Sequence, residues 1–214
     1  MSLHHITRRS ALIVVDVQRD FCPGGSLAVA DGDRVVEVIN AIAPQFGFVV
    51  ATKDWHPVGH VSFASTHAEK QPFDSVTLED GLIQALWPDH CVQGTAGAEF
   101  HPDLDMRPVN VVLHKGTGRD LDSYSAFFEN DGRTATGLGD MLRGLGFDTV
   151  FVCGLATDVC VFFTASDARR LGFNVYVIED ASRGVNVPTG SVAQKLAEMR
   201  NAGCTVIPST KLMT

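Results

Sequence analysis

The segment from Val152 to Cys160 carries the first candidate catalytic residue of this chain. Its apolar residues indicate a short strand that ends at Gly154, and Thr157 is a residue type that favours the N-cap of a following helix. Cys160 would then lie in the first helical turn, where free backbone N–H groups and the helix dipole favour the nucleophilic thiolate. The same N–H groups could bind an oxyanion. The alternative is a buried structural cysteine, the commoner kind of unpaired cysteine.

Two charged residues at the ends of other apolar segments extend this chemistry. Asp16 closes a β-branched run that begins at Ala11, and Lys115 follows the apolar segment that begins at Val109. A carboxylate at the end of a buried strand is costly unless it is paired or functional. If the strands are neighbours, Asp16 can exchange the thiol proton of Cys160 and Lys115 can stabilise the thiolate. A structural ion pair between Asp16 and Lys115 is the alternative.

A second group of residues has the types that bind metal ions. Asp54 and His56 alternate, so an extended segment would point both side chains to one side. With His90, they would offer one carboxylate and two imidazoles, a set that suits zinc, iron(II) or manganese and leaves positions open for water or substrate. His60 is a candidate fourth ligand. The Asp-x-His spacing is a weak indication by itself, because most surface histidines bind nothing.

Alternating strands and helices must position these residues. The pattern predicts strands over 11–17, 48–51, 109–113, 149–153, 174–178 and 204–207, and helices over 34–46, 137–145, 158–171 and 189–202. Such alternation implies a parallel sheet covered by helices on both faces, with ligands bound beyond the carboxyl ends of the strands. We therefore predict a single α/β domain over residues 1–214, with three α/β/α layers and about six mostly parallel strands. A long loop region over about 53–108 would hold the metal site.

Composition excludes several other classes of protein. The chain has 214 residues and a net charge of -8, so it has no general attraction for nucleic acid. No apolar run approaches the roughly 18 residues of a membrane span, and the first ten residues lack the apolar core of a signal peptide. The five cysteines are an odd set without CxxC spacing, which indicates reduced thiols and a cytoplasmic location. The sequence does not define an assembly, although a homo-oligomer is compatible with it.

Five ordered motifs resemble the nicotinamidases, which belong to the isochorismatase-like cysteine hydrolases. The motifs are VDVQRDF (15–21), KDWHP (53–57), WPDHC (87–91), HKG (114–116) and GLATDVC (154–160). The resemblance covers nearly the whole chain. It implies a catalytic triad of Asp16, Lys115 and Cys160.

The resemblance also implies how the rest of the site is built. Metal ligands would fall on Asp54, His56 and His90. A cis peptide between Leu155 and Ala156 would direct the N–H groups of Ala156 and Cys160 toward an oxyanion. The pocket for an aromatic ring would be lined by Phe21, Trp87 and Tyr124, with ordinary core packing as the alternative for these three aromatics.

The activity implied by the resemblance is hydrolysis of nicotinamide to nicotinate and ammonia through a cysteine thioester, a reaction of NAD salvage. One divalent metal ion would bind the pyridine nitrogen, with zinc as the first choice and iron or manganese as alternatives. Pyrazinamide would be a second substrate, because its ring also offers a nitrogen and a carboxamide. Arg183, after the fifth strand, is expected to serve a turn rather than the site.

Two other functions remain open on the sequence. The first is another amidase or isochorismatase-type hydrolase, because such relatives share the triad but generally lack the metal ligands. The second is a non-catalytic small-molecule binding domain on the same scaffold, since a fold alone does not define a function. A nucleotide-binding role is disfavoured, because the Gly-x-Gly after Lys115 continues to Leu121 where the dinucleotide fingerprint needs glycine.

Overall fold

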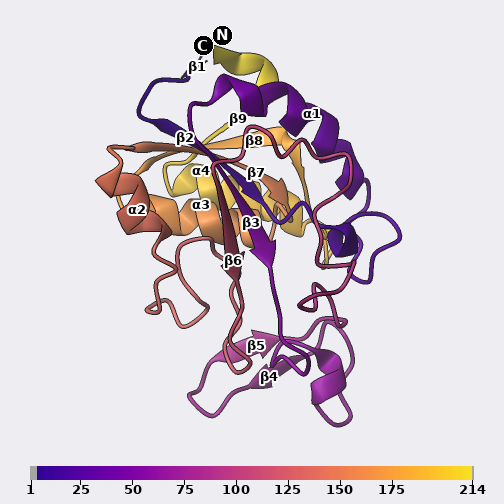
Figure 1. Cartoon of the computed structure of the whole chain (residues 1–214). Coiled ribbons are helices and arrows are strands. Elements are labelled where there is room, and N and C mark those ends of the chain that lie inside the picture. The colour runs from indigo at the N-terminus through magenta and orange to yellow at the C-terminus, as the bar shows by residue number, and fades with distance from the viewer. Residues whose placement is uncertain (1–3, 214) are drawn as a thin grey trace.

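The computed structural model describes residues 4–213, and a six-stranded parallel sheet forms its centre (Figure 1). The strand order is β6-β3-β2-β7-β8-β9. The bounds are β2 Ser10–Val15, β3 Val49–Asp54, β6 Val111–Lys115, β7 Thr149–Leu155, β8 Asn174–Arg183 and β9 Thr205–Ile207. Every neighbouring pair in this sheet is parallel, which confirms the predicted α/β class and the mostly parallel sheet.

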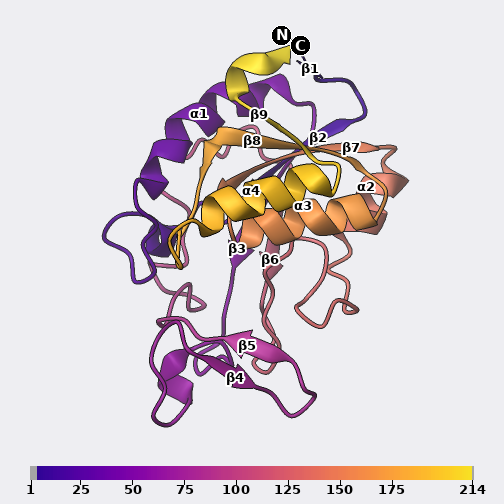
Figure 2. The same cartoon turned by 180° about the vertical axis from the view of Figure 1, so that it is seen from behind.

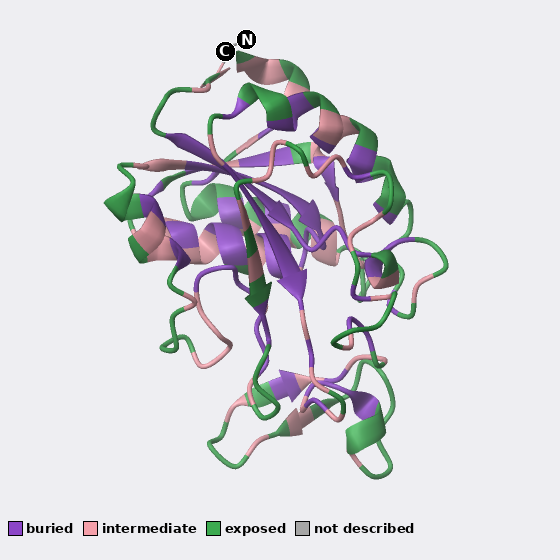
Figure 3. Cartoon of the chain, viewed as in Figure 1, coloured by how far each residue is buried: buried purple, intermediate pink, exposed green. Residues whose placement is uncertain are grey.

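Helices cover both faces of the sheet. They are α1 (Val35–Ile42), α2 (Leu138–Gly144), α3 (Cys160–Arg170) and α4 (Ser191–Asn201). Figures 1 and 2 show α1 on one face and the other three on the opposite face. The hydrophobic core therefore has two layers, one on each face of the sheet. Alternate residues of β2 belong to different layers. Leu12 and Val14 pack with α1, whereas Ile13 and Val15 pack with α2, α3 and α4. The strand is therefore buried on both sides, as Figure 3 shows, and its continuous apolar run reflects this.

The long loop region contains little regular structure. A short antiparallel hairpin of β4 (Ser75–Thr77) and β5 (Ile83–Ala85) lies in a lobe beyond the carboxyl ends of β3 and β6 (Figure 1). At the opposite end of the molecule, β1 (His4–His5) pairs with β10 (Leu212–Met213). The single-turn 3-10 helices are η1 Arg19–Phe21, η2 Gly32–Arg34, η3 Ala43–Gln45, η4 Ala64–Thr66 and η5 Ser209–Lys211. Within residues 4–213, none of the helices has both the length and the apolar character needed to cross a membrane.

The register of the strands brings the candidate residues to one edge of the sheet. Asp54 and Lys115 are direct partners where β3 and β6 end. Val15, the last residue of β2, pairs with Gly154 near the end of β7. Asp16 therefore emerges beside the turn that leads to Cys160. This is the edge at which a parallel sheet of this kind binds ligands.

Candidate active site

The turn between β7 and α3 presents Cys160 at the start of a helix. Strand β7 ends at Leu155, the Leu155–Ala156 peptide is cis as the resemblance implied, and Cys160 is the first residue of α3. Within the described residues, neither the Ala156 nor the Cys160 N–H group donates a hydrogen bond. These two donors are therefore available for an oxygen atom of a bound substrate.

The helix begins later than the sequence predicted. The N-cap is Val159, with no capping side chain, so the assignment of Thr157 as N-cap is wrong. The Thr157 N–H instead donates to the Arg183 carbonyl at 2.8 Å, while the Asp158 carboxylate accepts the Val185 N–H at 2.8 Å. These bonds hold the turn against the end of β8 and the residues just after it. Tertiary contacts thus take the place of a local helix cap.

Asp16 directly follows β2, and its side chain is held in one orientation. Its backbone adopts a left-handed conformation with φ of 48°, and its side chain has no solvent exposure. The Asp16 N–H donates to Thr52 Oγ1 at 3.1 Å, and the Thr52 hydroxyl donates to Asp16 Oδ1 at 2.5 Å. The second carboxylate oxygen of Asp16 faces Lys115.

The buried ammonium of Lys115 joins the candidate catalytic residues. Its Nζ lies 2.8 Å from Asp16 Oδ2 and forms a second ion pair with Asp54 Oδ1. It also donates to the Ser123 carbonyl at 2.9 Å and to Cys160 Sγ at 3.5 Å. The Cys160 sulfur and one carboxylate oxygen each of Asp16 and Asp54 lie within 4.8 Å of one another. The structure thus brings together the three residues that the sequence placed at separate strand ends.

Burial and charge set the protonation of this group. Burial raises the pKa of Asp16 to about 6, against the opposing effect of Lys115. Burial alone would lower the pKa of Lys115, but Asp16 and Asp54 raise it well above its usual range. Burial also raises the pKa of the Cys160 thiol, and the nearby carboxylates add to this effect. Burial and the two carboxylates thus oppose the thiolate that a position at the start of a helix favours, whereas Lys115 supports it.

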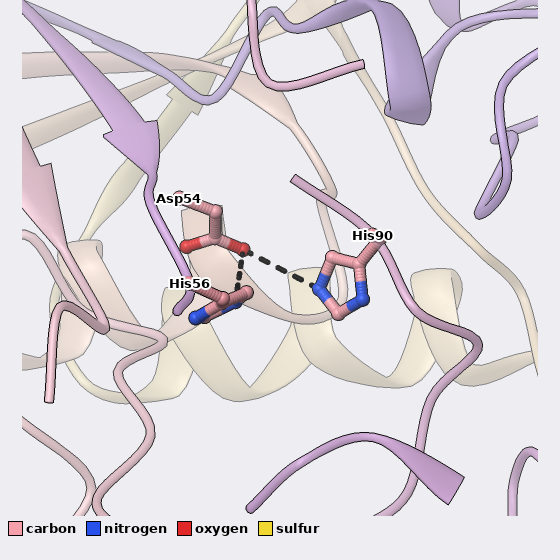
Figure 4. A group of neighbouring side chains, drawn as sticks. All are labelled: Asp54, His56 and His90. Atoms are coloured by element: carbon pink, nitrogen blue, oxygen red, sulfur yellow. Dashed lines mark ion pairs between the residues drawn. The ribbon is translucent and has the colours of Figure 1, made fainter. Parts of the chain in front are cut away.

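Asp54, His56 and His90 converge beside this group (Figure 4). Asp54 Oδ2 lies 3.5 Å from His56 Nε2 and 3.7 Å from His90 Nε2. The Nδ1–H of His56 donates to the Gly116 carbonyl at 2.9 Å, and that of His90 donates to the Pro88 carbonyl at 2.7 Å. These bonds leave the Nε2 lone pair of each ring directed at the Asp54 carboxylate. Backbone carbonyls commonly orient metal-binding imidazoles in this way.

The residues present fit a divalent cation. His56 Nε2 is buried without a hydrogen-bond partner, although a buried acceptor normally has one. The separations from Asp54 Oδ2 are close to the roughly 3.4 Å expected for two donors about 2.1 Å from a shared ion. In addition, the Asp16 and Asp54 carboxylates share a single ammonium, so this buried region carries excess negative charge that a cation would balance.

His60, the candidate fourth ligand, has other partners. Its ring stacks on His56 with centroids 4.1 Å apart, its Nδ1 lies 2.7 Å from Ser62 Oγ, and its Nε2 donates to the Leu121 carbonyl at 3.3 Å. Burial and His56 lower its pKa to about 4, so the ring is neutral. Both ring nitrogens are thus engaged, and the structure does not direct His60 at Asp54 Oδ2.

A cavity opens beside Cys160 and the Asp54–His90 pair. The predicted pocket residues Phe21, Trp87 and Tyr124 all line it. The sequence missed four further lining residues, which are Leu27, Asp122, Val159 and Val185. Val185 and Leu27 both lie outside the strands and helices that the sequence predicted, so no sequence signal pointed to them. Arg183 is the last residue of β8 rather than part of a turn, because this strand continues beyond the predicted 174–178. Its side chain donates to the carbonyls of Asp180 and Ser182 and does not line the cavity.

Comparisons with known proteins match this arrangement. A family model described as the isochorismatase domain matches residues 10–211. A nicotinamidase of Acinetobacter baylyi is 49% identical over 203 residues, which cover 95% of this chain and 94% of that protein. A crystal structure of an L. infantum protein in complex with nicotinate is 40% identical, with a TM-score of 0.86 and coverage of 99% of this chain and 98% of that chain. A pyrazinamidase of Pyrococcus horikoshii, solved in complex with zinc, is 38% identical, with a TM-score of 0.74 and coverage of 94% and 99%.

Proposed function

Because this chain belongs to the isochorismatase family and, within it, to the nicotinamidases, we propose that it hydrolyses nicotinamide to nicotinate and ammonia with Cys160 as the nucleophile. The observation that carries the proposal is the contact of one buried ammonium, Lys115 Nζ, with both the Asp16 carboxylate and the Cys160 sulfur. A free thiol, a base and a fixed positive charge beside an apolar cavity are the components of a cysteine hydrolase. A binding domain without catalytic activity would have no need for this costly buried group.

The acylation step follows from these contacts. With the ring between Phe21 and Trp87, the carboxamide carbon lies over Cys160 Sγ. As sulfur attacks, the thiol proton passes to Asp16, and the N–H groups of Ala156 and Cys160 bind the carbonyl oxygen as it becomes negative. Asp16 then gives the proton to the departing nitrogen. Ammonia leaves and the acyl group remains on sulfur as a thioester.

Deacylation uses the same residues in reverse order. Asp16, again a carboxylate, takes a proton from a water molecule that attacks the thioester carbon. The C–S bond breaks, Asp16 returns the proton to sulfur, and the product leaves as nicotinic acid, which loses its carboxyl proton to solvent to give nicotinate. Throughout both steps Lys115 stays positively charged, because its pKa is raised, and it stabilises whichever of Asp16 and Cys160 is negative.

Asp54, His56 and His90 would hold one divalent metal ion, and we propose zinc. The donor set of one carboxylate and two imidazoles suits this ion, and the similar pyrazinamidase of P. horikoshii was solved with it. When bound, the ion would take the pyridine nitrogen as a ligand, orient the ring and withdraw electron density from it. On this proposal residues 1–214 form one hydrolase domain in the cytoplasm, and the region 53–108 supplies the metal site.

Ammonia release from nicotinamide by the purified protein tests the proposed function. We expect turnover, with a slower or comparable reaction on pyrazinamide, and no ammonia from benzamide, which has the same carboxamide but no ring nitrogen. Absence of ammonia from nicotinamide, with zinc, iron and manganese each supplied, would refute the proposal. Equal turnover of benzamide would refute the contact with the ring nitrogen while leaving the cysteine chemistry in place.

Replacing His56 with alanine should lower metal content and nicotinamide affinity together. The variant removes His56 Nε2, which is buried without a hydrogen-bond partner, so about 10- to 100-fold weaker metal binding is expected. Metal per protein, measured by atomic emission, and KM for nicotinamide provide the check. His101→Ala is the matched control, because that ring accepts the Asp103 N–H at 3.3 Å and does not line the cavity. Loss of metal with unchanged KM would contradict the ring-nitrogen contact.

The rate should depend on the protonation of Asp16. A base must be ionised to accept a proton, and the pKa of Asp16 is raised to about 6. We therefore expect kcat/KM to be constant above this pH and to fall about tenfold per unit below it. Metal content measured at each pH serves as the control. If kcat/KM falls only at pH values where the protein has already lost its metal, the assignment to Asp16 would be contradicted.

A further inference from the structure

Two segments far apart in the sequence form one wall of the substrate pocket. Trp87 follows β5 in the lobe, and Tyr124 lies in the loop after β6. The Trp87 indole N–H donates to the Tyr124 hydroxyl at 3.1 Å, with the ring centroids 6.4 Å apart and nearly perpendicular. The backbone of Trp87 is already fixed by hydrogen bonds of 2.8 Å with Ser62 and Ala64. The bond to the Tyr124 hydroxyl therefore acts on the orientation of the indole ring and not on the backbone of Trp87.

A buried glutamine ties these two segments together. Gln84, in β5, is only 1% exposed. Its Nε2 lies within hydrogen-bond distance of three acceptors, which are Asp122 Oδ2 at 2.8 Å, Ala85 O at 2.8 Å and Tyr124 Oη at 3.3 Å. Asp122 in turn accepts the Ser123 N–H at 2.8 Å. The side chain of Gln84 is thus a bridge from the hairpin of the lobe to the loop that carries Tyr124.

The hydroxyl of Tyr124 is approached by two donors. Trp87 Nε1 donates to it at 3.1 Å, and Gln84 Nε2 lies 3.3 Å away. An amide nitrogen has two N–H groups, and Asp122 and Ala85 are nearer acceptors at 2.8 Å, so the contact with Tyr124 is a longer, shared one. Without Gln84, the bond from Trp87 would remain, but the amide that packs beside the Tyr124 oxygen and ties it to Asp122 would be lost.

We propose that Gln84 is a positioning residue that sets the shape of the pocket wall through Tyr124 and Trp87, and so the affinity for an aromatic carboxamide. The inference rests on the proposed function. Gln84 does not itself line the cavity, and the acceptors of its amide are Ala85, Asp122 and Tyr124 rather than Asp16, Lys115 or Cys160. Its loss should therefore weaken substrate binding and leave the chemistry on sulfur largely intact.

The variant Gln84→Met tests this proposal, because methionine is also unbranched and similar in volume but cannot donate a hydrogen bond. The chain has two tryptophans, so a Trp55→Phe background leaves Trp87 as the sole fluorescent reporter. Relative to that background, we expect KM for nicotinamide to rise roughly three- to tenfold, the effect of one or two lost hydrogen bonds. We expect kcat to change by less than about twofold, and the Trp87 emission to shift.

Gln93→Met is the matched control. Gln93 belongs to the same lobe, is exposed, and donates to the Trp55 backbone carbonyl at 2.8 Å, away from the cavity. It should leave KM and emission unchanged. If Gln84→Met also leaves both unchanged, the proposed role of Gln84 is wrong. A fall in kcat without a rise in KM would overturn it as well.

Tyr124→Phe supplies a second route to the same answer. It removes the oxygen at which the Gln84 and Trp87 donors meet but leaves the bond from Gln84 to Asp122. Combining it with Gln84→Met should raise KM little beyond Tyr124→Phe alone, whereas additive effects would refute a route through Tyr124.

If Gln84→Met does not fold, Tyr124→Phe still tests the inference. Unchanged Trp87 emission in Tyr124→Phe would refute it. Wild-type protein without turnover of nicotinamide would instead refute the proposed function, while the emission of Trp87 still tests Gln84.

Discussion

Alanine at position 160 is expected to abolish nicotinamide hydrolysis and to leave the fold intact. The variant removes the sulfur to which Lys115 donates, so no thioester can form, and loss of an enzyme's nucleophile costs about 10⁴-fold or more in kcat. Alanine is a good helix former at the first residue of α3, and the side chain lost is small. Steady-state ammonia release measures the rate, and thermal unfolding should shift by only a few degrees, about what a change near 1 kcal/mol produces.

Cys204→Ala is the matched control for this variant. Cys204 is a free, buried thiol like Cys160, but its Sγ lies 3.9 Å from the Ala165 carbonyl and does not reach the cavity. Its substitution should leave kcat unchanged. Near-normal activity in Cys160→Ala would remove this cysteine as the nucleophile, and equal loss in both variants would point to damage of the fold.

Replacing Asp16 with asparagine should stop acylation. Asparagine keeps the shape of the side chain and an acceptor for the Thr52 hydroxyl, but it cannot take the thiol proton. Because the Cys160 thiol has a raised pKa, it depends on this base, and we expect the rate of thioester formation to fall by about 10²- to 10⁴-fold. Rapid-quench mass spectrometry of the intact protein measures that rate directly.

Asp105→Asn provides the control for a lost carboxylate. Asp105 forms an ion pair of 2.7 Å with the highly exposed Arg107, and exposed pairs of this kind contribute little to stability. Its rate of thioester formation should equal that of the wild type. If Asp16→Asn formed the thioester at that same rate, another group would have to be the base.

The convergence of the site was predictable because it depends on strand ends. Asp16, Lys115 and Cys160 each follow an apolar run, and parallel strands bring such positions to one edge whatever the detailed packing. The Asp54–His56 alternation needed only an extended chain to place both side chains together. Periodicity therefore sufficed for the sheet, the four main helices and the grouping of the polar residues.

Properties that depend on tertiary packing were not predictable in this way. Thr157 is a good N-cap by type, but its N–H is taken by Arg183 and the helix begins at Cys160. The raised pKa of the Cys160 thiol was not predictable, because burial, its largest cause, follows from the packing of the whole pocket. Gln84 lies in a three-residue strand inside an irregular region, and only the folded lobe brings it to Tyr124.

The pairing of β1 with β10 makes the protein suitable for rearrangement of its chain. His4 lies opposite Leu212 in a parallel pair, at the end of the molecule remote from the lobe (Figure 1). Termini that are neighbours on the surface permit circular permutation and domain insertion. Because the two strands run in the same direction, a linker between them must reverse its course and so needs more residues than a tight turn.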